Sequence, residues 1–469
     1  MHGYAPATEE DLAAYEAIVA RLRRLPADRP VRMRAEKLAE VFVREGRRRR
    51  RGLGRAEMAR QDAELAATTV TGATDRREDA PLALPTNPSG PTGLTGLTGP
   101  TEGGLGTYQR AHNCYVCKQS YRQVDAFYHQ LCPACAAVNS AHCALSTDLR
   151  GRRALLTGGR VKIGFQLALM LLRDGAELTV TSRFPQDTLR RFRADPGSGA
   201  WLDRLSVVGI DLRDPRQVIG LCDRLLAEGR PLDILINNAA QTVRRPPEAY
   251  ALLAAGERGA LEAGRVEDGR VEAGRVELAP GFRSPGTELS LPALHLAPDE
   301  AGLLPDTAPR NSWSARLGEL DPVELLETQL VNSVAPALLC DRLLPLLLQG
   351  EPDHHRYIVN VTAVEGRFAV RNKTGGHPHT NMAKAALNML TRTSAAELTT
   401  RGVQMCAVDT GWITDENPAP RKARIAARGF RPPLDVVDGA ARIYHPIVAG
   451  EAGAPFAGVF LKDYRPADW

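Results

Sequence analysis

The sequence lacks any long apolar run. No segment approaches the roughly 18 apolar residues that a membrane-spanning helix needs, and the nearest, 343–348, is short and contains Pro345. The N-terminus also lacks a basic start followed by an apolar stretch, so we expect no secretory signal. These two absences argue against a membrane-spanning and against a secreted protein.

Cysteine is scarce, and neither sign of charge is in large excess. The chain has eight cysteines in 469 residues, too few and too clustered for a disulfide scaffold. We therefore expect a reducing, cytoplasmic setting. The formal net charge of +5 is modest and does not by itself indicate a nucleic-acid partner.

What the sequence does contain is enough for more than one folded unit. With 469 residues, 43% of them hydrophobic, two or more units are expected. We divide the chain into a helical N-terminal region (1–84), a linker (85–107), a cysteine-rich segment (108–147) and a larger domain (148–469). The linker is rich in Gly, Pro and Thr, so almost nothing in it can be buried.

The N-terminal region has the spacing of amphipathic helices. Leu12, Tyr15, Val19 and Leu22 recur at intervals of three to four residues. This pattern predicts a small helical pair or a partner-binding arm. Five consecutive arginines at 47–51 are interpreted as a solvated helix end or linker. The alternative is contact with nucleic acid, an acidic lipid surface or an acidic partner.

Two CxxC pairs form the most specific local motif. Each pair turns two thiolates toward one point, and two pairs supply the tetrahedral four-sulfur shell that zinc prefers. Four protein ligands leave no position for water, so the metal would be structural. Free thiols, a disulfide pair and an iron–sulfur centre are the alternatives. The expected ligands are Cys114, Cys117, Cys132 and Cys135.

From Ala154 onward the chain alternates between strands and helices. A short apolar strand, 154–156, precedes a glycine-containing turn and a helix over 163–173. The helix N-terminus after such a turn offers free amides and a partial positive charge to a phosphate. The further strands that we expect are at 178–181, before Asp211, and at 234–236, 357–361, 403–409 and 458–463. This alternation predicts an α/β fold with a Rossmann-like, doubly wound parallel sheet.

An ordered set of motifs in this domain resembles the short-chain dehydrogenase/reductase family. The set comprises Thr157-Gly158-Gly159-Arg160-Val161-Lys162-Ile163-Gly164, Asn237-Asn238-Ala239, Asn332, a helix carrying Lys384, and Thr410-Gly411-Trp412-Ile413-Thr414. The resemblance covers about 148–463 and implies hydride transfer to or from a nicotinamide dinucleotide. It also implies that 410–414 touch the nicotinamide side and that 415–433 form the variable substrate loop.

The same resemblance implies which residues contact the dinucleotide. They are Thr157, Gly158, Gly159, Lys162, Ile163, Gly164, Arg183, Asp211, Leu212, Asn238, Ala239, Lys384, Thr410, Gly411, Ile413 and Thr414. Arg183 stands where NAD-selective relatives carry an acid for the ribose hydroxyls, so NADP is expected rather than NAD. A plain surface arginine is the alternative. Lys162 replaces a family glycine, and it either obstructs the pyrophosphate or adds a positive charge beside it.

The catalytic positions depart from the family pattern. There, a tyrosine four residues before the lysine exchanges a proton with the substrate, and a serine positions the carbonyl. Here the tyrosine position is Thr380 and the serine position is Ala363. A threonine hydroxyl is far less acidic than a phenol. Lys384 and Asn332 are retained, so the candidate catalytic residues are Lys384, Asn332 and Thr380.

Three titratable side chains near Thr380 are candidates for a replacement acid. They are His377, His379 and Glu365, and histidine in particular titrates near neutral pH. The alternative for each is an ordinary loop residue beside the glycines at 375 and 376.

A long insertion interrupts the family pattern between Asn-Asn-Ala and Asn332. Within 241–321, a five-residue repeat over 264–277 reads GRVED, GRVEA, GRVE. The repeat suits neither a helix nor a strand, so we expect a disordered or weakly ordered loop. Trp313, near the end of the insertion, is expected to mark where the chain re-enters the fold.

Two classes of function remain open from the sequence. The first is a divergent NADP-dependent oxidoreductase that acts on a small molecule with a non-standard acid. The second is a non-catalytic nucleotide-binding scaffold or redox sensor that contacts a protein partner through the zinc module or the N-terminal helices. Nucleic acid is not the expected partner. A homo-oligomer is expected because family members are commonly dimers or tetramers.

Overall fold

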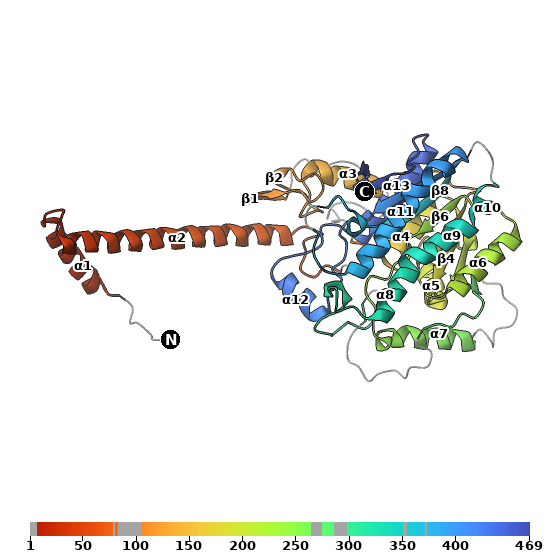
Figure 1. Cartoon of the computed structure of the whole chain (residues 1–469), viewed down its shortest axis with the longest axis horizontal. Coiled ribbons are helices and arrows are strands. Elements are labelled where there is room, and N and C mark those ends of the chain that lie inside the picture. Colours follow the sequence, from red (N-terminus) through yellow and green to blue (C-terminus); the bar gives the residue numbers. More distant parts are fainter. Residues whose placement is uncertain are drawn as a thin grey trace. The chain divides into compact units, whose positions relative to one another are not determined.

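The computed structural model describes residues 7–77, 80–82, 105–263, 274–285, 298–299, 301–349, 354–370 and 373–469. The chain forms two compact units (Figure 1). The first comprises Met1–Glu64 with Tyr108–Arg110, and the second comprises Leu65–Thr107 with Ala111–Trp469. Residues from 65 onward therefore pack with the larger unit, although we assigned them to the helical region 1–84.

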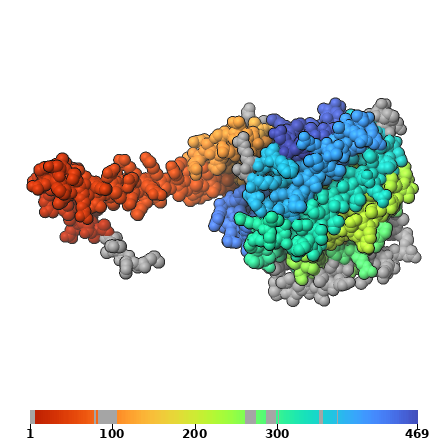
Figure 2. All heavy atoms as spheres, in the orientation of Figure 1, coloured from red at the N-terminus to blue at the C-terminus, as the bar shows by residue number. Residues whose placement is uncertain are grey.

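The first unit contains a helical hairpin, as the N-terminal spacing predicts. Helix α1 (Glu9–Arg23) begins at a capping box between Thr8 and Asp11, and α2 (Pro30–Ala67) follows. At 1.5 Å per residue, α2 is about 57 Å long and α1 about 22 Å, so α1 accompanies only the first part of α2 (Figure 2). All of α1 is described, and none of its side chains is buried. The arginines at 47–51 lie in α2, fully exposed.

The cysteine module, defined here as residues 111–143, begins in a two-stranded antiparallel sheet. Strand β1 (Gly106–Asn113) pairs with β2 (Ser120–Val124), with an irregularity between Thr107 and His112. Helix α3 (Pro133–Cys143) follows directly after Cys132, with Pro133 at its first position. Most of the linker that we assigned to 85–107 lies outside the described residues.

The second unit contains a nine-stranded sheet in the order β11-β10-β9-β8-β6-β3-β4-β5-β7. Every neighbouring pair is parallel except β10 and β11. The strands are β3 (Arg153–Leu156), β4 (Glu177–Ser182), β5 (Leu205–Gly209), β6 (Ile234–Asn237), β7 (Arg275–Leu278), β8 (Arg356–Thr362), β9 (Val403–Asp409), β10 (Phe460–Lys462) and β11 (Arg465–Ala467).

Helices cover both faces of this sheet. Leu156 packs in one core with side chains of α4, α5 and α13, whereas the adjacent Leu155 packs in a second core with α6, α9 and α11. Successive strand residues point to opposite faces, so two cores on two faces confirm the doubly wound α/β fold. The helices are α4 (Lys162–Arg173), α5 (Pro185–Arg193), α6 (Pro215–Glu228), α7 (Ala251–Ala263), α8 (Pro322–Gln329), α9 (Ala335–Arg342), α10 (Leu344–Leu347), α11 (Pro378–Thr400), α12 (Ala419–Ala427) and α13 (Val436–Glu451).

The insertion is more ordered than the sequence indicated. It contributes helix α7, and the third copy of its repeat forms strand β7, which pairs in parallel with β5. Our expectation that the repeat suits neither helix nor strand was therefore wrong for 275–278. The reason is tertiary: the absent side chain of Gly209 leaves room for Leu278, since an added Cβ would lie 2.7 Å from it. The first two copies, 264–273, lie outside the described residues.

The C-terminal strand expected at 458–463 is a hairpin. Strand β10 spans only Phe460–Lys462 and is followed by the antiparallel β11, which the sequence analysis did not include. Asp463 and Tyr464 make the turn with positive φ angles of 48° and 66°. In the described part of the chain, no helix has the length and apolar character to cross a membrane.

Candidate functional site

A cavity of about 400 Å³ lies at the carboxyl ends of the central strands β3, β4, β5 and β6. Ligands of doubly wound sheets bind at this edge, and the volume is within the usual range for small-molecule sites. The cavity takes its walls from the turn before α4, the ends of β4 and β5, the segment after β6, the insertion, and residues 413–416.

The turn before α4 and the first turn of that helix pack closely because each contains a glycine. Gly158 has a φ of +74°, and a Cβ there would lie 3.0 Å from the Cα of Ala239. A Cβ on Gly164 would lie 2.0 Å from the carbonyl oxygen of Gly158. The missing side chains let the chain fold back tightly, so the first amides of α4 face the cavity.

A hydrogen-bond brace fixes this turn to the strand beside it. The hydroxyl of Thr157 accepts bonds from the backbone N–H groups of Asn238 and Ala239, both at 3.0 Å. The Asn238 amide donates to the carbonyls of Thr157 at 3.0 Å and Gly158 at 3.1 Å. Two of the residues that the sequence assigned to the cofactor, Asn238 and Ala239, thus also line the cavity.

Lys162 adopts a backbone conformation that glycine favours. Its φ is +54°, in the left-handed region that costs other residues roughly 1 kcal/mol. Lys162 lines the cavity, as does Glu416. Burial raises the pKa of Glu416, but the positive charge of Lys162 and a hydrogen bond from Thr414 outweigh it and lower this pKa. The lysine therefore adds a cation to the cavity wall.

Arginines bring positive charge to the cavity at the ends of β4 and β5. Arg183 lies over the ring of Tyr250, with 5.0 Å between its guanidinium carbon and the ring centroid, and donates to the tyrosine hydroxyl at 3.3 Å. Burial raises the pKa of Asp211, but its ion pair with Arg213 at 2.6 Å outweighs this and lowers the pKa. The cationic residues of the wall are Arg160, Lys162, Arg183, Arg213 and Arg245.

Several residues of this wall were not found from the sequence. Arg160 has 11% of its side chain exposed and forms an ion pair with Asp187 at 2.8 Å. Tyr250 and Arg245 come from the insertion, which was expected to be a disordered or weakly ordered loop. Arg160 directly follows Gly158 and Gly159, so its place in the motif could have identified it as a residue of the cavity wall. No motif marks Arg245 or Tyr250 in this way.

The segment after β9 contributes only part of what the sequence assigned to it. Ile413 and Thr414 line the cavity, whereas Thr410 and Gly411 do not. Gly411 has a φ of +80° and packs against Leu434, whose Cδ1 would lie 2.5 Å from an added Cβ. Gly411 thus shapes the segment and does not form the wall.

Asn332 lies in a π-helical turn, Leu330–Val334, between α8 and α9. Its side chain is buried and exchanges two hydrogen bonds with the backbone of Gln241: the N–H donates to Oδ1 at 2.7 Å, and Nδ2 donates to the carbonyl at 2.9 Å. Such single π turns are rare and frequently mark functional sites. The amide therefore ties the segment after β6 to this turn.

The other two candidate catalytic residues are buried in α11. The Nζ of Lys384 donates to the carbonyl of Val361 at 2.8 Å, and burial lowers the pKa of Lys384 to about 8. Thr380 is 2% exposed, and its hydroxyl has no hydrogen-bond partner among the described residues. Ala363 precedes a short 3₁₀ turn. The cavity wall includes none of these three residues.

Of the candidate replacement acids, His377 and His379 lie at the start of α11, and Glu365 lies in the 3₁₀ turn after β8. His377 stacks on Trp313 with ring centroids 4.1 Å apart. Ala301 and Leu303 already line the cavity, so the insertion returns to the fold before Trp313, the residue expected to mark this point. Burial lowers the pKa of His379, and neither of its ring nitrogens has a partner in the described part of the chain. Burial and the nearby carboxylate of Asp409 raise the pKa of Glu365.

The four cysteines of the two CxxC pairs converge. Their sulfur atoms all lie within 4.8 Å of one another, and those of Cys117 and Cys132 are 3.7 Å apart. Four thiolates that converge in this way match the shell of a structural metal. His129 is held elsewhere, with its Nδ1 2.8 Å from the hydroxyl of Thr71. The four cysteines are the expected set: Cys114, Cys117, Cys132 and Cys135.

Comparison with protein families identifies two matching stretches. Residues 152–253 match the family model described as short chain dehydrogenase. Residues 301–427 match the model described as enoyl-(acyl carrier protein) reductase. The two matches lie on either side of residues 254–300, which belong to the insertion.

Curated and solved proteins are also similar to this chain. The chain is 31% identical over 350 residues to an uncharacterized protein, R665, of Acanthamoeba polyphaga mimivirus, which covers 71% of each chain. It is 34% identical over 110 residues to the short chain dehydrogenase/reductase dpmpG of Macrophomina phaseolina, 24% of this chain and 62% of that one. A short chain dehydrogenase from Burkholderia cenocepacia, solved with NADP, is 22% identical, with a TM-score of 0.44, and covers 67% of this chain and 97% of that one.

Proposed function

Because this chain belongs to the short-chain dehydrogenase/reductase family, a family of oxidoreductases, we propose that it binds NADP(H) in the cavity at the carboxyl ends of β3–β6. The observation that carries the proposal is the pairing of a glycine cradle with a basic wall. A Cβ on Gly164 would strike the carbonyl of Gly158 at 2.0 Å, so only this glycine turn leaves the α4 amides open to a pyrophosphate.

The basic wall favours the phosphorylated dinucleotide. Arg183, at the end of β4, would pair with the 2′-phosphate, since it stands where an acid would otherwise bind the ribose hydroxyls. Arg183 is stacked on Tyr250, which holds its planar group beside the cavity. Guanidinium groups bind phosphates in a bidentate manner, so Arg183 serves this purpose better than a lysine would. We propose that the other residues that the resemblance assigns to the dinucleotide, of which Thr157 is the first and Thr414 the last, also contact NADP(H).

The bound nucleotide would supply a hydride acceptor or donor for a small-molecule substrate. The chain itself supplies Lys384, whose buried ammonium would hold the ribose, and Asn332, whose side chain fixes the backbone beside the cavity. Thr380 is not the proton donor, because a threonine hydroxyl does not ionise near neutral pH. Glu365 is the proposed acid, since burial and Asp409 raise its pKa and so keep its proton to higher pH.

A second function is favoured by one observation. Thr380 is buried without a hydrogen-bond partner among the described residues, and Ala363 carries no hydroxyl. A centre of this kind would bind the nucleotide without transferring a proton. The chain would then be a nucleotide-binding scaffold or redox sensor. The two functions share the same cavity and differ in whether NADPH is consumed.

We further propose that the four cysteines bind a structural Zn²⁺. The donor set is four thiolates whose sulfur atoms lie within 4.8 Å of one another, which suits a tetrahedral ion with Zn–S bonds of about 2.3 Å. Iron would also accept four thiolates, and metal analysis separates the two. All eight cysteines are free thiols, which supports the proposal of a reducing, cytoplasmic location.

We also propose that the helical hairpin pairs with a second copy of this chain. The groove between α1 and the first part of α2 is lined by Leu12, Tyr15, Ile18, Leu38 and Phe42, each between 45% and 70% exposed. Five such side chains expose on the order of 500 Å², so two facing copies would bury about 1,000 Å², the lower bound for a specific interface. Two isolated helices bury too little to be stable alone.

Arg183→Ala is expected to weaken NADPH binding about 10- to 100-fold and to leave NADH binding nearly unchanged. Hydrogen bonds to a charged group contribute roughly 1.5–3 kcal/mol, and only NADPH has the 2′-phosphate. Calorimetric titration measures both affinities. Arg216→Ala, an arginine 90% exposed and paired with Asp214, is the control. If the variant lost affinity equally for NADPH and NADH, Arg183 would not be the residue that binds the 2′-phosphate. If the unaltered chain bound neither nucleotide, the NADP(H) proposal would be refuted.

Lys384→Ala is expected to abolish turnover if the protein is an oxidoreductase. The ammonium is present below pH 8 and is lost as the pH rises through about 8, so NADPH affinity should fall over that interval. Lys384→Arg keeps the positive charge and should shift the decrease in NADPH affinity to higher pH. NADPH consumption is followed with a panel of aldehydes and ketones. Tight binding without consumption of NADPH by any carbonyl would support the non-catalytic function instead.

Purified protein is expected to carry one zinc ion per chain, and Cys117→Ser should release it. Loss of one thiolate opens the shell and removes a ligand that helps fold the module. Cys143→Ser is the matched control, because Cys143 lies at the end of α3 outside the four-cysteine cluster. Elemental analysis gives the stoichiometry. Iron in place of zinc, or full zinc retention in Cys117→Ser, would contradict this proposal.

Phe42→Glu is expected to convert a dimer into a monomer, because it places a charge in the apolar groove. Leu53→Glu on the same helix is the control, since Leu53 is 69% exposed and outside the groove. Light scattering after gel filtration measures the mass at about 10 μM. A monomeric unaltered chain, or a Phe42→Glu dimer, would show that the groove does not join two copies.

A further inference from the structure

One segment of the cavity wall is held from outside the α/β fold. The 410–434 segment connects β9 to α13 and includes α12, and its residues Ile413, Thr414 and Glu416 line the cavity. Both ends of this segment are hydrogen-bonded to the cysteine module or to residues 71–76, which are joined to that module. The contacts at each end indicate what sets the position of the wall.

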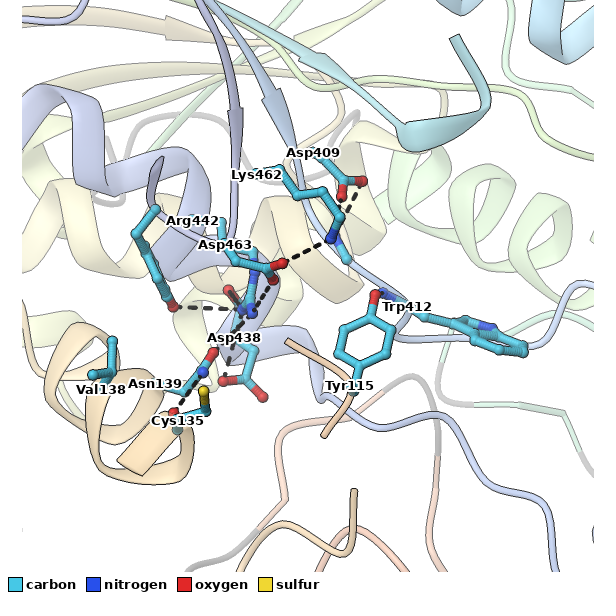
Figure 3. A network of polar contacts seen from close by, with 12 residues as sticks. Tyr115, Cys135, Val138, Asn139, Asp409, Trp412, Asp438, Arg442, Lys462 and Asp463 are labelled. Carbon is cyan, nitrogen blue, oxygen red and sulfur yellow. Dashed lines mark hydrogen bonds and ion pairs between the residues drawn. The ribbon is translucent and has the colours of Figure 1, made fainter. Parts of the chain in front are cut away.

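Tyr115 holds the first end. It lies between Cys114 and Cys117 in the first CxxC pair, and its hydroxyl accepts a hydrogen bond from the backbone N–H of Trp412 at 2.9 Å (Figure 3). Gly411, the residue before Trp412, has a φ of +80° and lies beside the Tyr115 hydroxyl, which would be in ordinary van der Waals contact, at 3.5 Å, with an added Cβ. A residue of the metal site thus touches the chain one residue before the cavity wall.

The ring of Tyr115 is also held by the α/β domain. The ammonium of Lys462 lies 5.5 Å from the ring centroid. Lys462 is itself positioned by Asp409 at 3.5 Å and by Asp463 at 2.7 Å (Figure 3). Asp409 is the last residue of β9, so Tyr115 lies directly against the point at which the 410–434 segment leaves the sheet.

Arg76 and Gln130 hold the second end. The guanidinium of Arg76 donates to the carbonyls of Pro432 and Leu434, and to that of Ile413 at 3.5 Å. Arg76 therefore bridges the two ends of the segment. The amide of Gln130 donates to the carbonyl of Arg431 at 3.1 Å.

These three holding residues belong to one bonded cluster. The N–H of Tyr115 donates to the carbonyl of Gln130 at 2.8 Å. Arg76 donates to the carbonyl of Thr71 at 2.9 Å, and the Thr71 hydroxyl accepts from the N–H of His129 at 2.9 Å. Through these bonds, the positions of Tyr115, Arg76 and Gln130 depend on one another.

The cluster is built around the four thiolates. Tyr115 lies between two of the cysteines, and Gln130 lies two residues before Cys132. The module consists of a short two-stranded sheet and an 11-residue helix. The module buries side chains such as Val124, Tyr128 and Leu131, but in a unit this small closure of the metal shell supplies much of the folding free energy and defines the loops that carry the cysteines. Loss of the metal frees the loops that carry Tyr115 and Gln130.

We infer that the cysteine module is a metal-dependent clamp on the 410–434 segment. With zinc bound, Tyr115, Gln130 and Arg76 hold both ends of the segment, and Ile413 and Thr414 stand in the cavity wall. Without zinc, the segment is released and the wall opens. The inference rests on the proposed NADP(H) and zinc sites and adds a regulation of the first by the second.

Thermodynamic linkage gives the inference a quantitative form. If zinc raises the affinity for NADPH by some factor, NADPH must raise the affinity for zinc by the same factor. Couplings between sites are typically about 5- to 150-fold. A competing chelator reports the zinc affinity with and without NADPH, and calorimetry reports the NADPH affinity with and without zinc.

Amide hydrogen exchange tests the clamp without any nucleotide. The full chain is compared as purified with zinc and after treatment with a chelator under reducing conditions. Peptides that cover 410–434 should exchange at least tenfold faster without zinc, while peptides from β3 and β6 should not change. Unchanged exchange over 410–434 after complete zinc removal would overturn the inference.

Two tyrosine variants separate the clamp from general support by the module. Tyr115→Phe removes the acceptor for the Trp412 N–H, whereas Tyr128→Phe removes a hydrogen bond of 2.7 Å from the same module to Asp438 in α13. Both should retain zinc. Tyr115→Phe should speed exchange over 410–434 and weaken NADPH binding about fivefold, and Tyr128→Phe should do neither.

Failure of the clamp and failure of the proposed function are distinguishable. If zinc protects 410–434 but NADPH does not bind to the zinc-loaded chain, the clamp stands and the nucleotide proposal falls. If NADPH binds equally well with and without zinc, or if Tyr128→Phe matches Tyr115→Phe, the clamp is refuted while the nucleotide site remains.

Discussion

The buried guanidinium of Arg442 joins the cysteine module to the α/β domain. Arg442 is 1% exposed in α13 and donates to the side chain of Asn139 in α3 at 2.8 Å and to that of Asp463 after β10 at 3.3 Å (Figure 3). Its ring neighbour is Tyr464, with 4.9 Å between the guanidinium carbon and the ring centroid. A buried cation is tolerated only when such partners surround it. The two segments that supply them must therefore pack against α13, and the module belongs to the same compact unit as the sheet.

The cavity depends on a similar convergence of distant segments. Its glycine turn comes from the start of the domain, its brace from Asn238 after β6, and its aromatic support from Tyr250 in the insertion. The insertion also adds strand β7 to the edge of the sheet. The insertion thus contributes both a strand of the sheet and residues of the cavity wall, Arg245 and Tyr250.

The fold and the centre of the site were predictable to different degrees. Strands such as β8 and β9 have mainly apolar interiors, Tyr357–Val359 and Met405–Val408, so their place in a buried parallel sheet follows from local sequence. The convergence of Cys114, Cys117, Cys132 and Cys135 follows from spacing in the same way. By contrast, the strand in 275–278 has charged residues on both sides of Val276, and only pairing with β5 makes it a strand. The burial of Lys384 against the Val361 carbonyl is likewise a result of packing.

The sequence by itself determined the alternation of strands and helices, the glycine turn, the spacing of the four cysteines, and the presence of Thr380 and Ala363. These are properties of residue type and short spacing, which need no knowledge of distant contacts. Tertiary structure alone decided that Tyr115 meets the Trp412 amide and that residues of the insertion line the cavity. Hydrogen bonds between residues hundreds of positions apart depend on how the whole chain packs, and no local pattern encodes them.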